Sequence, residues 1–234
     1  MSKGFRRVLV ANRGEIAVRI LRTLKDLDIE SVVVYSDADQ NSLHVALADY
    51  AIRLPGVTPQ QSYLNINEII HCIHESEADA VHPGYGFLAE NEQFAEAVEK
   101  KTQASFIGPS FEVIKLMGDK IEARKFMQKH SFPIVPGSMG KLSSFKEVES
   151  LASDIQYPLI LKAAAGGGGR GMRIVEKASQ LQQAYDSCCR EAEVAFGRGD
   201  VFCERYLAKP RHIEFQILMD HKGHGVHLYE RDCT

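Results

Sequence analysis

The chain has 234 residues, of which 44% are hydrophobic and 25% are charged, and its formal net charge at pH 7 is -3. This length fits one large or two small domains, and the absence of a long basic run gives no support to nucleic-acid binding. No apolar run approaches the ~20 residues of a membrane-spanning helix, and the first residues lead directly into a strand instead of a signal-peptide core, so we expect a cytoplasmic protein without a membrane partner.

The first hundred residues alternate between strand and helix patterns. Arg7–Ala11 is a continuous apolar strand, and the next strand is Ser31–Tyr35. This order predicts a parallel sheet with a right-handed crossover. The helix between the two strands has one apolar face, formed by Ile16, Ala17, Ile20, Leu21 and Leu24. Further on we expect helices over Tyr63–Ser76 and Leu88–Lys101, with Phe94, Ala97 and Val98 facing inward, and strands over Ala78–Val81 and Ala104–Ile107.

Two loops of this part are candidate ligand sites. Asp37 follows the second strand, where nicotinamide-dinucleotide proteins place the acidic residue that binds the ribose. The first turn, however, holds only Gly14, so a diphosphate could not approach closely and this alternative is the weaker one. The turn His82–Phe87 lies at the carboxyl end of a strand, and the sequence leaves open whether it binds a ligand or forms a structural corner.

Lys162–Met172 is the most glycine-rich stretch of the chain. Ordering these glycines costs so much backbone entropy that a ligand is the expected compensation. Strand patterns over Tyr157–Ala164 and Met172–Val175 flank the glycines, so we predict a hairpin whose NH groups bind phosphate, with Lys162 as a point charge. A strand after the glycines excludes the dinucleotide and P-loop motifs, both of which open a helix. A disordered linker is the alternative.

The remaining elements predict a small α+β domain and a hairpin. The pattern changes at Gly118, which leads into a helix over Ile121–Lys129. Another helix carries Leu151, a later one carries Leu181, Tyr185, Cys188, Ala192 and Ala195, and the strand Val201–Arg205 follows. From Arg211 to Asp220 the sequence alternates, and we expect the face with Ile213, Phe215, Ile217 and Met219 to be core. The opposite face, with His212, Glu214 and Gln216, is either solvated or turned toward a ligand.

The sequence does not predict a metal site or disulfide bonds. The turn His221–Gly225 and the strand Val226–Glu230 carry three histidines, but no carboxylate or thiol is clearly placed with them to complete a zinc site. The five cysteines are odd in number and lack C-x-x-C spacing, so we expect free and mostly buried thiols.

Six motifs follow one another along the chain: Val10–Ala17, His82–Asn91, Met117–Lys120, the glycine hairpin, Pro210–Glu214 and Glu230–Cys233. Together they resemble the biotin carboxylase component of biotin-dependent carboxylases, which is an ATP-grasp enzyme. The resemblance runs in register from Arg6 to Thr234. It implies an α/β fold in four parts: an amino-terminal parallel-sheet domain over 1–117, a connecting helix and loop over 118–134, an ATP-grasp lid over 135–206, and the incomplete start of the ATP-grasp core over 207–234.

The resemblance also implies a nucleotide site. Lys120 and Lys162 would contact the ATP phosphates, and Gly168 and Gly169 would close over them. Adenine would lie against Glu204, Arg205, Tyr206 and Leu207, and Met172 and His212 would complete the pocket. No catalytic residue and no magnesium ligand is expected among these residues, because in the family both lie beyond the position of Thr234.

By resemblance, the activity is that of a ligase which carboxylates biotin on a carrier domain, using bicarbonate and MgATP and passing through carboxyphosphate. The implied partners are the carrier domain, a carboxyltransferase and a second copy of the chain. The helix Glu15–Lys25 would supply part of the contact with the second copy, and the alternative is that its polar face is only solvated. The final acceptor, an acyl-CoA such as acetyl-CoA or a keto acid such as pyruvate, stays open. Because the metal ligands lie beyond Thr234, we expect these residues alone to be inactive. The alternatives are a non-catalytic fragment that binds nucleotide or dimerises, and a nicotinamide-dependent oxidoreductase.

Overall fold

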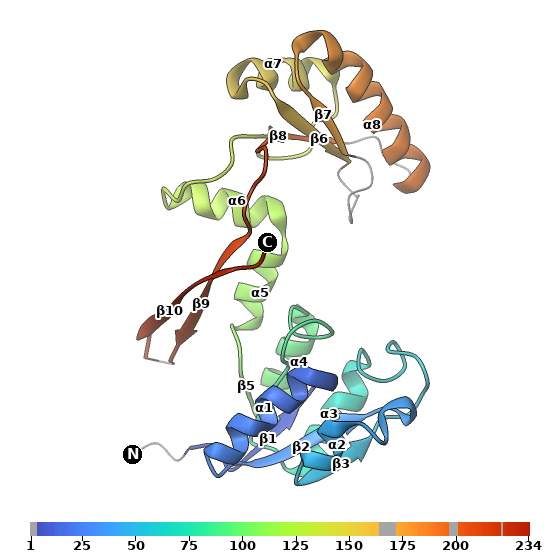
Figure 1. The fold of residues 1–234 in the computed structure, drawn as a ribbon, viewed down its shortest axis with the longest axis vertical. Coiled ribbons are helices and arrows are strands. Elements are labelled where there is room, and N and C mark those ends of the chain that lie inside the picture. The colour runs from blue at the N-terminus through green and yellow to red at the C-terminus, as the bar shows by residue number, and fades with distance from the viewer. Residues whose placement is uncertain (1–3, 164–171, 197–200, 221) are drawn as a thin grey trace. The chain divides into compact units, whose positions relative to one another are not determined.

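The computed structural model describes residues 4–163, 172–196, 201–220 and 222–234. The chain divides into two compact units, Met1–Ala123 and Arg124–Thr234, whose elements are labelled in Figure 1. The finer four-part division implied by the resemblance stays a prediction.

The first unit contains a five-stranded sheet in the order β3-β2-β1-β4-β5, and every neighbouring pair is parallel. The predicted parallel sheet is therefore confirmed. Its central strand has Val8, Leu9 and Val10 completely buried, because helices cover both faces. The strands are β1 (Arg7–Val10), β2 (Glu30–Tyr35), β3 (Tyr50–Arg53), β4 (Ala80–His82) and β5 (Ser105–Phe106).

Helices pack against the two faces of this sheet (Figure 1). Val8 and Val10 pack with helix α1 on one face, and Leu9 packs with α3 and α4 on the other. The inward residues expected on α1 and α4 are buried or, for Ile16, partly buried, as predicted. The helices of this unit are α1 (Gly14–Asp26), α2 (Leu43–Leu47), α3 (Ile66–Ser76), α4 (Glu92–Lys101) and α5 (Phe111–Gly118).

Asparagine caps explain where two helices begin. The side chain of Asn65 accepts a hydrogen bond from the amide of Glu68, and that of Asn91 accepts one from Phe94. Helices α3 and α4 therefore start after these residues, and the predicted starts at Tyr63 and Leu88 were too early. The short elements α2 and β3 were not predicted at all.

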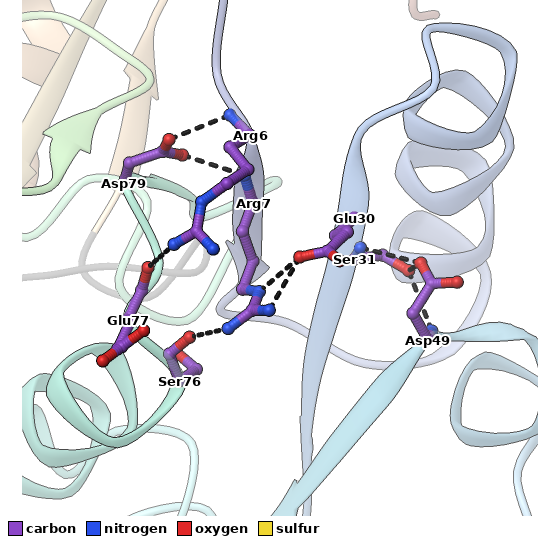
Figure 2. A network of polar contacts seen from close by, with 8 residues as sticks. All are labelled: Arg6, Arg7, Glu30, Ser31, Asp49, Ser76, Glu77 and Asp79. Atoms are coloured by element: carbon purple, nitrogen blue, oxygen red, sulfur yellow. Dashed lines mark hydrogen bonds and ion pairs between the residues drawn. The ribbon is translucent and has the colours of Figure 1, made fainter.

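A polar network fixes the amino-terminal end of β1 (Figure 2). The backbone amides of Arg6 and Arg7 donate to the two carboxylate oxygens of Asp79 at 2.8 and 3.0 Å. The Arg7 guanidinium donates to Glu30 on β2 at 2.7 Å and to the carbonyl of Ser76 at 2.5 Å. These contacts join β1 to β2 and to the segment before β4. They lie at the amino-terminal ends of the strands, opposite to the loops that follow the carboxyl ends of the strands.

The second unit contains a three-stranded antiparallel sheet, β7-β6-β8, with helices α7 and α8 against one face. The predicted strands on both sides of the glycines pair as a hairpin, and β8 has the predicted bounds. Burial in this core raises the pKa of the Cys188 thiol to about 11 and that of Cys203 to about 12. The elements are β6 (Leu159–Ala163), β7 (Met172–Val175), β8 (Val201–Arg205), α7 (Phe145–Ile155) and α8 (Leu181–Phe196), and helix α6 (Lys120–Lys129) crosses the boundary between the units.

A separate antiparallel ribbon is formed by β9 (Ile213–Met219) and β10 (Gly225–Asp232). The prediction that one face of β9 is core was wrong, because Phe215, Ile217 and Met219 are 59%, 54% and 64% exposed. Two strands alone cannot bury an apolar face, and among the described residues no layer covers it. No helix in the described part of the chain is long and apolar enough to cross a membrane.

Candidate functional site

Strands β6 and β8 place opposite charges on the face of their sheet that points away from the core. On β6, Leu159 and Leu161 are buried against the helices, so Lys162 lies on the opposite face. On β8, Val201 and Cys203 are buried, so Glu204 shares the face of Lys162. The register pairs Lys162 with Phe202 and Ile160 with Glu204, which makes the lysine and the glutamate diagonal neighbours.

Lys162 and Arg124 both approach the carboxylate of Glu204. The Nζ of Lys162 donates to Oε2 of Glu204 at 2.6 Å, and Nη1 of Arg124 lies 3.8 Å from Oε1. The side chains of Lys162, Glu204 and Arg124 are 37%, 26% and 17% exposed, so the cluster is partly screened from water. Two cations around one carboxylate leave a local charge of +1, which suits an anionic ligand.

Arg124 was not predicted as a site residue. It lies on α6, where its Nη2 donates to the carbonyl of Val135, and its buried Nε has no hydrogen-bond partner among the described residues. The sequence did contain a signal: Lys120 and Arg124 are four residues apart on one helix, and such residues share a face.

The segment before α7 pairs with β8 and shapes the backbone at Glu204. The amide of Ser138 donates to the carbonyl of Cys203 at 2.7 Å, and the amide of Arg205 donates to the carbonyl of Pro136 at 2.8 Å. A Cβ on Gly137 would lie 2.6 Å from the Cys203 carbonyl oxygen and 2.9 Å from the Cα of Glu204. Only glycine therefore allows this close approach.

The other predicted nucleotide residues are placed as follows. Met172 on β7 pairs with Lys162 across the hairpin, and Arg205 follows Glu204 on β8 but turns its guanidinium to the carbonyl of Ile155 at 2.8 Å. The amide of Tyr206 donates to the carbonyl of Pro158 at 3.0 Å, and Leu207 is about half exposed. The structure thus brings Lys162, Met172 and the Glu204 segment together.

Four predicted residues are not joined to that cluster by the described contacts. His212 precedes the β9–β10 ribbon, where its amide donates to Oγ1 of Thr234 at 3.0 Å. Lys120 is the first residue of α6, but its side chain is outside what the structure describes. Gly168 and Gly169, with the rest of the predicted glycine tip, lie outside the described residues.

The carboxyl ends of β1 and β4 form a second loop cluster, at the point where the strand order reverses. The side-chain amide of Asn12 donates to the carbonyls of Pro83 at 2.7 Å and Tyr85 at 2.8 Å. Gly84 has a positive φ of 67° and packs against Asn12. Burial lowers the pKa of His82, whose Nδ1 accepts a hydrogen bond from Gly84 at 3.0 Å. These contacts favour the interpretation that the turn His82–Phe87 is a structural corner. Tyr85 is the exception, because it is exposed.

The acidic residues after β2 are engaged in ion pairs. Asp37 accepts two hydrogen bonds from Arg53, at 2.5 and 2.8 Å. Asp39 is buried and accepts from Arg13, from the hydroxyl of Tyr63 and from Ser36, and the Arg13 contact holds the pKa of its carboxyl well below the usual range. A ribose hydroxyl would have to displace the Asp37–Arg53 pair, which weakens the dinucleotide alternative.

Among the described residues, no group of three or more histidine, cysteine, aspartate or glutamate side chains could hold a metal ion. No described cysteine forms a disulfide bond within the described part of the chain; Cys72, Cys188 and Cys203 are buried, Cys189 is partly buried and Cys233 is exposed. The described part of the chain therefore offers a cationic cluster but no metal centre.

Comparison with known families accounts for almost the whole chain. Residues 4–114 match the family model "Biotin carboxylase, N-terminal domain", and residues 119–234 match "Carbamoyl-phosphate synthase L chain, ATP binding domain". The 2-oxoglutarate carboxylase small subunit of Hydrogenobacter thermophilus is 48% identical over 230 residues, which are 98% of this chain and 48% of that subunit. The biotin carboxylase of a Nostoc strain is also 48% identical, over 98% of this chain and 51% of its own length.

Solved structures agree with these relatives. The crystal structure of the biotin carboxylase domain dimer of the Hydrogenobacter thermophilus enzyme, in complex with MgADP, ADP and bicarbonate, superposes with a TM-score of 0.82 at 48% identity. The match covers 99% of this chain and 51% of that one, so the chain spans about half the length of the proteins it matches. With both of its halves matched in this order, the chain belongs to the biotin carboxylase family.

Proposed function

We propose that this chain is the amino-terminal portion of a biotin carboxylase, a ligase that uses MgATP and bicarbonate to carboxylate biotin on a carrier domain through carboxyphosphate. The observation that carries the proposal is the identity of 48% across 98% of the chain to a subunit whose biotin carboxylase domain was solved with MgADP and bicarbonate. The same relative is a 2-oxoglutarate carboxylase, so the acceptor of the carboxyl group is not narrowed to an acyl-CoA or pyruvate.

Within this function, the described residues contribute to the nucleotide site through the face of the β7-β6-β8 sheet that carries Lys162 and Glu204. Lys162, with Lys120, contacts the phosphates, where a fixed ammonium matches the charge that develops during phosphoryl transfer. Gly168 and Gly169 close over the phosphates, and Glu204, Arg205, Tyr206 and Leu207 contact adenine, with Met172 and His212 beside them. By the resemblance, the magnesium ligands belong to the part of the relatives that this chain does not cover.

We also propose a homodimer, a biotin carrier domain and a carboxyltransferase as partners, and a cytoplasmic location. The dimer is supported by the related crystal structure, which is described as a domain dimer. Helix α1 has Arg19 and Arg22 on its exposed side, and the only described side-chain hydrogen bond of either is from Arg19 to Thr23. The division into parts at residues 117, 134 and 206 belongs to the same proposal.

Isothermal titration calorimetry tests nucleotide binding. We expect MgATP to bind and NADH not to bind, and we expect Lys162→Met to weaken ATP by about 1.5 to 3 kcal/mol while AMP is affected less. Lys146→Met, which removes an exposed lysine on α7, is the matched control and should leave both affinities unchanged. An equal loss for ATP and AMP would place Lys162 away from the phosphates, and tight NADH binding would favour the oxidoreductase.

Phosphate release distinguishes the enzyme from a non-catalytic fragment. A protein of the relatives' full length should release phosphate from ATP in the presence of bicarbonate. We expect no release from these residues alone, because the resemblance puts the magnesium ligands in the part of the relatives that this chain does not cover. Biotin-stimulated release from the 234-residue chain, above that of a Lys120/Lys162 double variant, would contradict this expectation.

A further inference from the structure

The carboxylate of Glu204 lies between two cations that contact it unequally. One oxygen accepts a 2.6 Å hydrogen bond from Lys162, and the other is 3.8 Å from Arg124, which is beyond hydrogen-bond length. In the described structure, therefore, Lys162 is the main counter-ion of Glu204 and Arg124 is a second, looser one.

The three N–H donors of Lys162 can contact both the Glu204 carboxylate and a phosphate, but its single positive charge cannot neutralise both. If Nζ turns to a nucleotide phosphate, as the proposed function requires, Glu204 loses its close partner. A carboxylate that is 26% exposed then lies beside a polyphosphate, and like charges in a partly screened site repel each other. This repulsion weakens nucleotide binding, and a second cation beside the carboxylate removes the cost.

Arg124 is suited to that role. Its Nη2 is held by the Val135 carbonyl, while its buried Nε has no hydrogen-bond partner among the described residues. A guanidinium presents parallel donors that fit a carboxylate in bidentate fashion, and closing the gap from 3.8 Å to a normal charge-assisted bond needs a movement of about 1 Å. The neighbouring Arg205 is already turned to the Ile155 carbonyl.

We propose that Arg124 is a positioning residue of the nucleotide site, and that Glu204 exchanges its partner from Lys162 to Arg124 when a phosphate binds. The exchange keeps the carboxylate paired, so the charge of Lys162 is available to the phosphate. The proposal rests on the proposed function, because it presumes that Lys162 contacts nucleotide phosphates.

Calorimetry with MgATP and with AMP tests the exchange on the wild-type chain, Arg124→Met, Glu204→Gln and the double variant. We expect Arg124→Met to weaken MgATP about tenfold or more, the value of one charge-assisted contact, and to change AMP much less. Glu204→Gln removes the repelling carboxylate, so it should restore most of the MgATP affinity in the Arg124→Met background. Arg124→Lys keeps the positive charge but not the two parallel guanidinium donors, so it should lose less MgATP affinity than Arg124→Met.

A purely structural role for Arg124 gives a different pattern. Loss of its contact with Val135 would weaken ATP and AMP equally, and Glu204→Gln would not restore binding; that result overturns the proposal. If a thermal melt shows that Arg124→Met does not fold, Arg124→Lys replaces it in the test. A larger loss of MgATP affinity than of AMP affinity in Arg124→Lys then supports the exchange, and equal losses overturn it. Wild-type chain that binds no MgATP contradicts the proposed function as well, whereas wild-type binding with an unaffected Arg124→Met contradicts this inference alone.

Discussion

The central strand β1 and the ribbon strand β9 carry equally clear apolar patterns, but only β1 is buried. Val8, Leu9 and Val10 have no exposed surface, whereas Phe215 and Ile217 on β9 are more than half exposed. The difference lies in where the covering layer comes from. In a parallel sheet each crossover between strands is a helix, so the chain that makes the strands also makes their cover.

An antiparallel ribbon has no such guarantee, because a short turn joins its strands and contributes no layer. The alternation on β9 therefore shows which residues need a cover without showing what supplies it. The β7-β6-β8 sheet lies between these cases, since α7 and α8 cover one of its faces and the charged Lys162–Glu204 face stays partly open.

The largest expected effect comes from removing a covered side chain. Leu9→Ala should lower the free energy of unfolding by about 2 to 5 kcal/mol, because it leaves a cavity in a fully buried layer. The matched change Ile217→Ala on β9 should stay within about 0.5 kcal/mol. Urea denaturation of both variants measures the difference, and equal losses would show that the ribbon is covered in solution.

The ion pair between the buried Asp39 and the exposed Arg13 gives the next effect. Asp39→Asn should destabilise by about 1.5 to 3 kcal/mol, because it removes a charge-assisted bond to Arg13. The folded-state pKa of Asp39 is lowered, chiefly by Arg13, so its contribution is complete above the unfolded pKa of about 4 and is lost as the pH falls through the lower folded pKa. The difference in free energy of unfolding between wild type and Asp39→Asn, measured by urea denaturation at several pH values, should therefore become smaller below about pH 4. A gap that widens there would contradict this assignment.

A glycine substitution at the charged face should have a smaller effect on stability. Gly137→Ala forces a Cβ to within 2.6 Å of the Cys203 carbonyl, and overpacking of this kind costs about 1 to 3 kcal/mol. Gly140→Ala is the control, because a Cβ there meets nothing within 4 Å among the described residues. Thermal melts compare the two. The affinity for MgATP should fall for Gly137→Ala alone, since the backbone at Glu204 shifts.

The smallest effect on folding stability is expected for an exposed apolar residue of the ribbon. Phe215→Asp should leave the unfolding temperature unchanged but reduce self-association, because it interrupts an exposed apolar patch. Light scattering against concentration measures this. Val57→Asp, at a residue 79% exposed in the first unit, should change nothing. Unchanged light scattering for Phe215→Asp would show that the chain does not self-associate through the β9–β10 ribbon.

Local patterns were enough to predict most of the fold. The parallel sheet, the glycine hairpin strands and β8 follow from apolar runs and periodicity. Helix α2 was missed because five residues are too few to show a helical period, and β3 was missed because it is a mostly exposed edge strand without a continuous apolar run. Lys162 and Glu204 were predicted for the site, but their direct contact depends on β-sheet register, and Arg124 depends on where α6 packs. Neither contact follows from a local pattern, although the four-residue spacing of Lys120 and Arg124 marks Arg124 as a candidate.

The position of β1 in the middle of its sheet also constrains how the first unit folds. Residues 7–10 pair with residues 30–33 on one side but with residues 80–82 on the other, and Asn12 bonds to Pro83 across 71 residues. A nascent chain can form the β1–β2 pair early, but it cannot complete the central strand until β4 has been synthesised. Closing so long a loop costs entropy before it gains contacts. The β1–β4 pairing is thus the step on which cooperative folding of this unit depends.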